Sequence, residues 1–239
     1  MGPGRARAPG RARFNSSDLV RQLADLAVDD AVPEPPSLAQ GLGRWLGWTD
    51  AIALASALQG PVAMAAQPLT IGAATAQCQL VRNELTTAII RDPAVTGDSS
   101  GLLLLTPKPG APLESPTDYA PYRRHALALQ RQMEAAITPL RARLRAAVAA
   151  VPALARLAAL DAVLDNALAA RQRSLLAAVP TLLQRRFDQR ARDAAGGPPA
   201  AWLAIFGQDL KAALLAELDT RLQPAEGLLD ALRNETSPA

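Results

Sequence analysis

The sequence predicts an all-α protein built from long, kinked antiparallel helices, either bundle-like or coiled-coil-like. A smaller N-terminal helical part precedes them, and no significant sheet is expected. Composition is the first reason: of 239 residues, 52 are Ala and 38 are Leu, while aromatic residues make up only 3%. Ala and Leu lead the helix scale, whereas strands favour β-branched and aromatic residues. Spacing is the second: apolar residues of the C-terminal half recur at steps of three, four and seven, as on one helix face.

Four segments follow from the distribution of Gly, Pro and charge. They are an Arg-rich arm over residues 1–15, expected to be disordered, an N-terminal helical part over 16–93, a Pro/Gly/Ser-rich linker over 94–117, and a long-helix part over 118–235. The arm offers nothing to bury. The linker contains two turn-rich stretches, and Leu102–Leu105 between them is expected to cover a groove on one of the helical parts.

Helix caps and breakers divide the N-terminal part. The expected helices run from Ser16 or Ser17 to before Pro33, from Ser37 to about Gly47, from Thr49-Asp50 to Gly60, and from about Ala73 to Arg91. The apolar face of the last one is predicted to include Cys78 or Val81, then Leu85, Ala88 and Ile89. All of these segments are short compared with the helices that follow.

The long-helix part starts at a Thr117-Asp118 cap and is punctuated by prolines. Its first apolar stripe comprises Tyr122, Leu129, Met133, Ile137, Leu140, Leu144 and Val148. Pro139 lies inside this stripe and either kinks one helix or begins a new one; the unbroken stripe favours the kink. Pro152 marks a helix boundary.

Beyond Pro152 the apolar pattern continues in two sections separated by a Gly-Pro break. The first comprises Leu154, Leu157, Leu160 or Asp161, Leu164, Leu168, Leu175 or Leu176, Val179, Leu183 and Phe187, passing Pro180. Gly196–Pro199 is the clearest break, and Leu203, Phe206, Leu210, Leu214, Leu218 and Leu222 form the second section. Pro224 then allows a short terminal helix that ends near Arg233. Helices joined by short breaks are expected to pack antiparallel.

Positive charge is concentrated in the middle of the chain. Residues 121–195 hold 13 Arg and five acids, a balance of +8, against a net charge of +3 for the whole chain. The candidate partner-binding arginines are Arg141, Arg145, Arg185 and Arg186. A solvated helix face is the first interpretation, an acidic protein or lipid surface the second, and nucleic acid the third, because nucleic-acid readers usually add aromatics or a recognisable motif.

Residues for catalysis, metal binding or cofactor binding are not identified in the sequence. The single histidine, His125, has no companions at ligand spacing. Cys78, the only cysteine, is expected to be a buried, inert thiol. Asp161 and Asp165 share a helix face at i, i+4 and are expected to pair with Arg156 or with arginines of a neighbouring helix.

Two of the three tryptophans, Trp45 and Trp48, stand in one short segment. Tryptophan commonly anchors a core or an interface. The core is the default expectation, and a partner-binding role is the alternative.

The segments Asp18–Leu26 and Gly43–Ile52, which contains Trp-Leu-Gly-Trp-Thr-Asp-Ala-Ile, resemble the start of an uncharacterised proteobacterial family of unknown function. Arg131–Glu134, Pro139–Ala142, Leu157–Asp161 and Ala216–Pro224 are similar to later parts of it. The resemblance covers residues 16–233 and brings no catalytic residue or cofactor. Genes of that family lie beside predicted inner-membrane proteins of motor-stator type and proteins with peptidoglycan-binding domains. The resemblance therefore implies a cytoplasmic accessory of a cell-envelope complex.

The sequence thus predicts a non-enzymatic helical interaction or scaffold protein that self-associates through the stripes of residues 122–187 and 203–222. The alternative is a nucleic-acid-associated protein that uses residues 121–195. A cytoplasmic location is expected, since the longest clearly apolar stretch, Ala51–Leu58, is too short to span a bilayer.

Overall fold

The structure is a computed structural model that describes residues 46–60, 69–91, 118–194, 197 and 199–236. Every element within these ranges is a helix, as the composition predicts. The helices are α3 (Trp48–Gln59), α4 (Ile71–Ile90), α7 (Ala120–Ala149), α8 (Ala155–Ala177), α9 (Val179–Asp193) and α10 (Pro199–Thr236). Other predicted features lie outside the described residues. These are the helices expected before Trp48 and the linker with its segment Leu102–Leu105.

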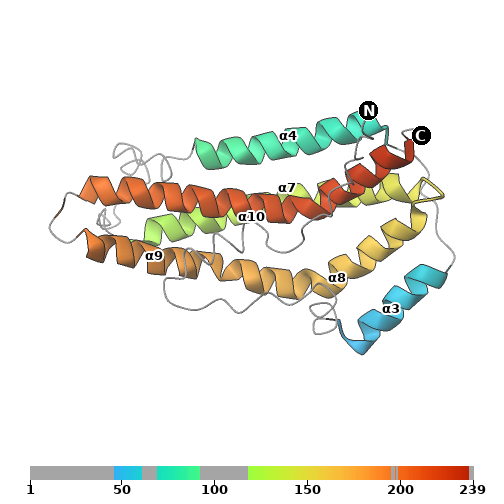
Figure 1. The fold of residues 1–239 in the computed structure, drawn as a ribbon, viewed down its shortest axis with the longest axis horizontal. Coiled ribbons are helices and arrows are strands. Elements are labelled where there is room, and N and C mark those ends of the chain that lie inside the picture. Colours follow the sequence, from blue (N-terminus) through green and yellow to red (C-terminus); the bar gives the residue numbers. More distant parts are fainter. Residues whose placement is uncertain (1–45, 61–68, 92–117, 195–196, 198, 237–239) are drawn as a thin grey trace, which may run out of the picture.

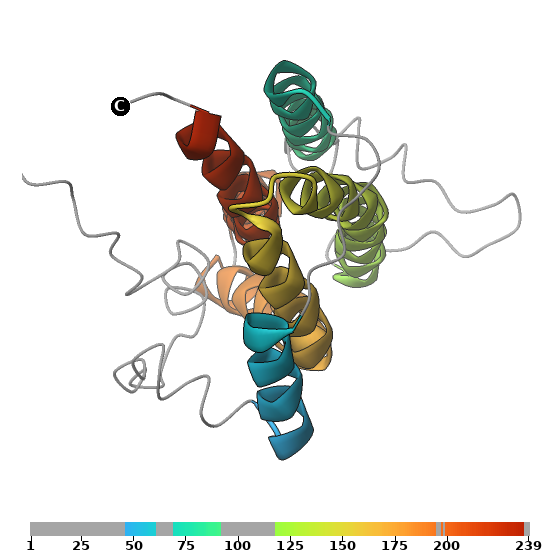
Figure 2. The same cartoon turned by 90° about the vertical axis from the view of Figure 1, so that its right-hand side faces the viewer.

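The centre of the molecule is the pair α7 and α10, which run in the same direction (Figure 1). Helix α4 runs the opposite way along one side of the pair, and α8 followed by α9 returns along another. The expected antiparallel packing of successive long helices is therefore present. Helix α3 lies against α8, at the edge of the molecule away from α4 (Figure 2).

The predicted stripes of α7 and α10 form most of the core. All seven stripe residues of α7 and all six of α10 are buried, and they belong to one continuous cluster with residues of α4 and α9. At one end of the cluster five aromatic rings pack together, with Phe206 in edge-on contact with Tyr122 and Phe187. The stripe residues of α7 and α10 are thus covered within one chain and offer no surface to a second copy, while the predicted self-association itself stays a prediction.

Two prolines lie in the interior of helices, and a third stands in the first turn of one. Helix α7 continues through Pro139, as the unbroken stripe favoured. Helix α10 continues through Pro224 to Thr236, so the separate terminal helix predicted there is wrong. The continuous burial of α10 on both sides of Pro224 explains this, because packing outweighs the lost backbone hydrogen bond. Pro180 instead stands in the first turn of α9, where its missing N–H costs little.

The helix boundaries in the N-terminal part differ slightly from prediction. Gly47, and not Thr49-Asp50, is the N-cap of α3, and the Asp50 carboxylate accepts the Gly47 N–H at 2.9 Å from inside the first turn. Helix α4 begins two residues earlier than expected, because the Thr70 hydroxyl accepts the Ala73 N–H. Its buried face contains Cys78, Leu85 and Ile89 as predicted.

Helix α8 departs most from its predicted stripe. Only Ala155, Ala158 and Leu176 are buried, whereas Leu157 is exposed and the other stripe leucines are half-buried. The reason is position: α8 lies at the edge of the bundle, and α3 covers it only partly.

Candidate functional site

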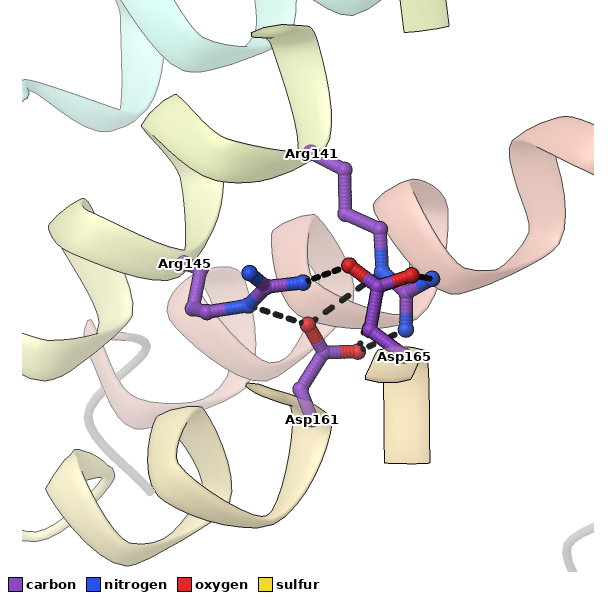
Figure 3. A network of polar contacts seen from close by, with 4 residues as sticks. All are labelled: Arg141, Arg145, Asp161 and Asp165. Carbon is purple, nitrogen blue, oxygen red and sulfur yellow. Dashed lines mark hydrogen bonds and ion pairs between the residues drawn. The ribbon is translucent and has the colours of Figure 1, made fainter. Parts of the chain in front are cut away.

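Helices α7 and α8 are joined by a compact network of two arginines and two aspartates (Figure 3). Arg141 and Arg145 lie one turn apart on α7, and Asp161 and Asp165 lie one turn apart on α8, so each pair projects from one helix face. Arg141 donates to Asp161 at 2.6 Å and to Asp165 at 2.5 Å. Arg145 donates to the same two carboxylates at 2.6 Å each. Asp161 is only 11% exposed, so this network ties the two helices together.

The network confirms that the two aspartates pair with arginines of a neighbouring helix. Burial lowers the pKa of Arg145, but the hydrogen bonds that it donates to Asp165 and Asp161, together with the negative charges of the two carboxylates, outweigh burial and raise that pKa overall. Arg141 and Arg145, predicted to bind a partner, are thus engaged within the chain.

A second ion pair group joins α9 to α10. Arg186 and Arg190 contact Asp209 at 3.0 and 3.1 Å. Arg185, its sequence neighbour, is exposed. Of the four arginines proposed from sequence as partner-binding residues, three therefore bridge helices.

The centre of the bundle contains a buried polar group. Glu217 of α10 is fully buried, and Arg221 holds it at 2.7 Å. Gln130 of α7 donates to both the Glu217 carboxylate, at 2.9 Å, and the Leu176 carbonyl, at 3.2 Å. Pro180 has no N–H to offer that carbonyl, which stands four residues earlier, so Gln130 replaces the missing helical hydrogen bond. The break between α8 and α9 is thereby fixed to α7.

Beside this group lies a cavity of about 250 Å³ between α7, α8 and α10. Its polar lining includes Glu134, Asp165, Asn166, Gln172, Arg173 and Arg221. Ile137 and Leu176 add apolar surface. The cavity thus combines both signs of charge with amide groups.

The edge formed by α3 and α8 has a different character. Trp48, Ile52 and Leu58 of α3 are 82%, 51% and 49% exposed, and no residue of α3 is buried. The default expectation of a core role is therefore wrong for Trp48, and Trp45 lies outside the described residues. Because α3 is the outermost helix, its outer side has nothing above it among the described residues.

Comparison with known proteins identifies a family that covers nearly the whole chain. Residues 5–234 match the family described as protein of unknown function (DUF3348). The chain belongs to this family. No curated protein and no solved structure matches the chain.

Membership of DUF3348 confirms the resemblance to an uncharacterised family, and it assigns no activity to any residue. Within the described ranges, none of the helices is both long and apolar enough to cross a membrane. The same ranges contain no group of three or more His, Cys, Asp or Glu side chains placed to hold a metal ion.

Cys78 is buried as predicted, and its pKa is raised, chiefly by burial and further by Glu226. Sequence reasoning missed the buried Glu217 and the cavity. The signal for Glu217 was present: it stands directly before the stripe residue Leu218, among apolar residues. The cavity had no comparable signal, since three helices contribute to it.

Proposed function

We propose that this member of DUF3348 is a non-enzymatic helical interaction protein that pairs with a second copy of itself through the outer face of α3. One observation carries the proposal: α3 is apolar on both sides but covered on only one. A helix that is apolar all round is normally buried.

The inner side of α3 follows helical spacing. Asp50, Ala53, Leu54 and Ala57 are half-buried, and they recur at i, i+3, i+4 and i+7, toward α8. The remaining positions face outward and are exposed. They include the large apolar side chains Trp48, Ile52 and Leu58 and the small Ala51 and Ala55.

The outer face carries no charged residue, since Asp50 is the one acid of α3 and lies on the inner side. Two copies can therefore approach face to face without repulsion between like charges. Most homodimers use such self-complementary contacts. Ala51 and Ala55, one turn apart, allow close approach of two helices, and Trp48 supplies a large apolar contact of the kind that dominates interfaces.

Light scattering at tens of micromolar tests the proposal. The wild-type protein is expected to be a dimer and Ile52→Glu a folded monomer. Because exposed positions affect the stability of one chain by only about 0.5 kcal/mol, the melting temperature of Ile52→Glu should equal that of wild-type protein diluted until it is monomeric. Ile205→Glu is the matched control, since Ile205 is a similarly exposed isoleucine on α10. A monomeric wild type, or a dimeric Ile52→Glu protein, contradicts the proposal.

A cytoplasmic accessory role at an inner-membrane complex, implied by the family resemblance, also belongs to this proposal. An accessory protein needs a surface for its partner, and a dimer presents two copies of each such surface. Co-purification from native cells should recover the same inner-membrane protein with the wild type and with Ile205→Glu. Recovery of no membrane protein would remove this part of the proposal and leave the dimer untouched.

A further inference from the structure

The cavity between α7, α8 and α10 has a charge arrangement that the fold itself does not use. The four charges of the α7–α8 network compensate one another, two positive and two negative. Arg221 compensates the buried Glu217. Among the cavity residues this leaves Glu134 on α7 and Arg173 on α8.

The side chains of Glu134 and Arg173 make no hydrogen bond or ion pair with any described residue, and they do not pair with each other. Both line the same cavity from facing helices. Both side chains are exposed, so a carboxylate and a guanidinium with no partner among the described residues stand at the solvent-facing rim of a single cavity. A ligand with one charge would satisfy only one of them.

The inner part of the cavity adds a further donor. Arg221 uses Nε and Nη2 on Glu217, at 2.8 and 2.7 Å, and its Nη1 has no hydrogen-bond partner among the described residues. Glu217 is fully buried and also accepts from Gln130, so the Arg221 guanidinium is held in place by a buried anchor. The Nη1 of this pre-oriented guanidinium can still donate a charge-assisted hydrogen bond to a carboxylate.

We propose that this cavity binds a small zwitterion of the free α-amino-acid class. Glu134 takes the ammonium group, and Arg173 together with Arg221 Nη1 takes the carboxylate. Asn166 and Gln172 supply amide groups for a polar side chain, and Ile137 contributes apolar contact. At about 250 Å³ the cavity is smaller than the roughly 300–1,000 Å³ of sites for drug-sized ligands, which favours a molecule of this size.

The site is independent of α3, because none of its lining residues lies on that helix. Binding and dimerisation can therefore be tested separately.

The experiment measures the melting temperature of the full-length protein with each of the twenty free amino acids at 10 mM. A ligand that binds the folded state raises the melting temperature. At least one amino acid is expected to do so, whereas acetate and methylammonium, which carry one charge each, are not. Calorimetric titration then gives the affinity of the strongest binder.

Glu134→Gln and Arg173→Gln are each expected to weaken that affinity at least tenfold. Glu84→Gln and Arg185→Gln are the matched controls, since both residues are exposed and lie on helices away from the cavity. These two substitutions should leave the affinity for the amino acid unchanged. The proposal is overturned if no amino acid raises the melting temperature, if acetate alone does so equally, or if the two cavity variants bind like the controls.

Discussion

The central pair α7–α10 and the edge pair α3–α8 are both rich in alanine and leucine, but the apolar residues of the central pair are buried and many of those of the edge pair are exposed. Every stripe residue of α7 and α10 is buried, including large side chains such as Phe206 and Met133. The edge pair buries only Ala155, Ala158 and Leu176, all on α8. Five of the eight exposed large apolar side chains of the described residues lie on the edge pair: Trp48, Ile52, Leu58, Leu157 and Leu175.

The difference shows that leucine content does not decide burial. In α7 the apolar residues form one narrow stripe, and the opposite face carries arginines, so only one orientation buries the stripe. In α3 and α8, alanine and leucine occur all round the helix. Such helices bury whichever side meets a neighbour and leave the other side available.

The largest expected effect tests the centre. Phe206 is fully buried and contacts three other aromatic rings. Phe206→Ala should reduce the free energy of unfolding by about 3–5 kcal/mol, because it leaves a cavity in packed surroundings. Urea denaturation measures this loss. Ile205→Ala, at the exposed neighbouring position, should change the same quantity by no more than about 0.5 kcal/mol. Equal losses would mean that α10 does not pack as described.

A second effect comes from pH. Burial raises the pKa of Tyr122 to about 12, while an unfolded tyrosine titrates near about 10. The folded state therefore favours the neutral phenol. The resulting stability is fully present below pH of about 10 and is lost as the pH rises toward about 12, by up to roughly 2–3 kcal/mol.

Denaturation between pH 9 and 11.5 measures this loss. Tyr122→Phe removes the titrating group and should flatten part of the decline; Tyr119, whose pKa burial also raises, accounts for a further part. A Tyr122→Phe protein with the wild-type pH dependence would show that Tyr122 is not buried.

The smallest expected effect on stability tests the contact between α7, in the central pair, and the α8–α9 break. Gln130→Leu removes the donor to the Leu176 carbonyl and to Glu217, which leaves two buried acceptors short of a hydrogen bond. A loss of about 2 kcal/mol in unfolding free energy is expected. Gln132→Leu, at an exposed site on the same helix, serves as the control in urea denaturation. If the two substitutions had the same effect, Gln130 would not fix the α8–α9 break.

Sequence alone predicted the helical class, the stripes of α7 and α10, and the breaks between α7 and α8 and between α9 and α10, because periodicity and backbone chemistry are local properties. It also predicted that Asp161 and Asp165 pair with arginines of another helix. It failed at Pro224, where a locally unfavourable proline is tolerated because buried leucines continue on both sides.

The sites were less predictable than the helices. Sequence reasoning chose Arg141, Arg145 and Arg186 as partner-binding residues, and their carboxylate partners come from other helices. It assigned Trp48 first to the core, since nothing local shows that α3 lies at an edge. Both outcomes depend on which helices become neighbours in the fold. The division of residues 1–235 into four segments stays a prediction.

Hydrogen exchange at two protein concentrations tests the central claim, that the outer face of α3 holds a second copy. Amides of α7 and α10 that exchange by local opening should be equally protected at both concentrations, because the core of one chain protects them. Amides of α3 should exchange rapidly at low concentration and become protected at tens of micromolar, where the dimer forms. If α3 exchanges at the same rate at both concentrations, or if α7 and α10 instead change, the claim is contradicted.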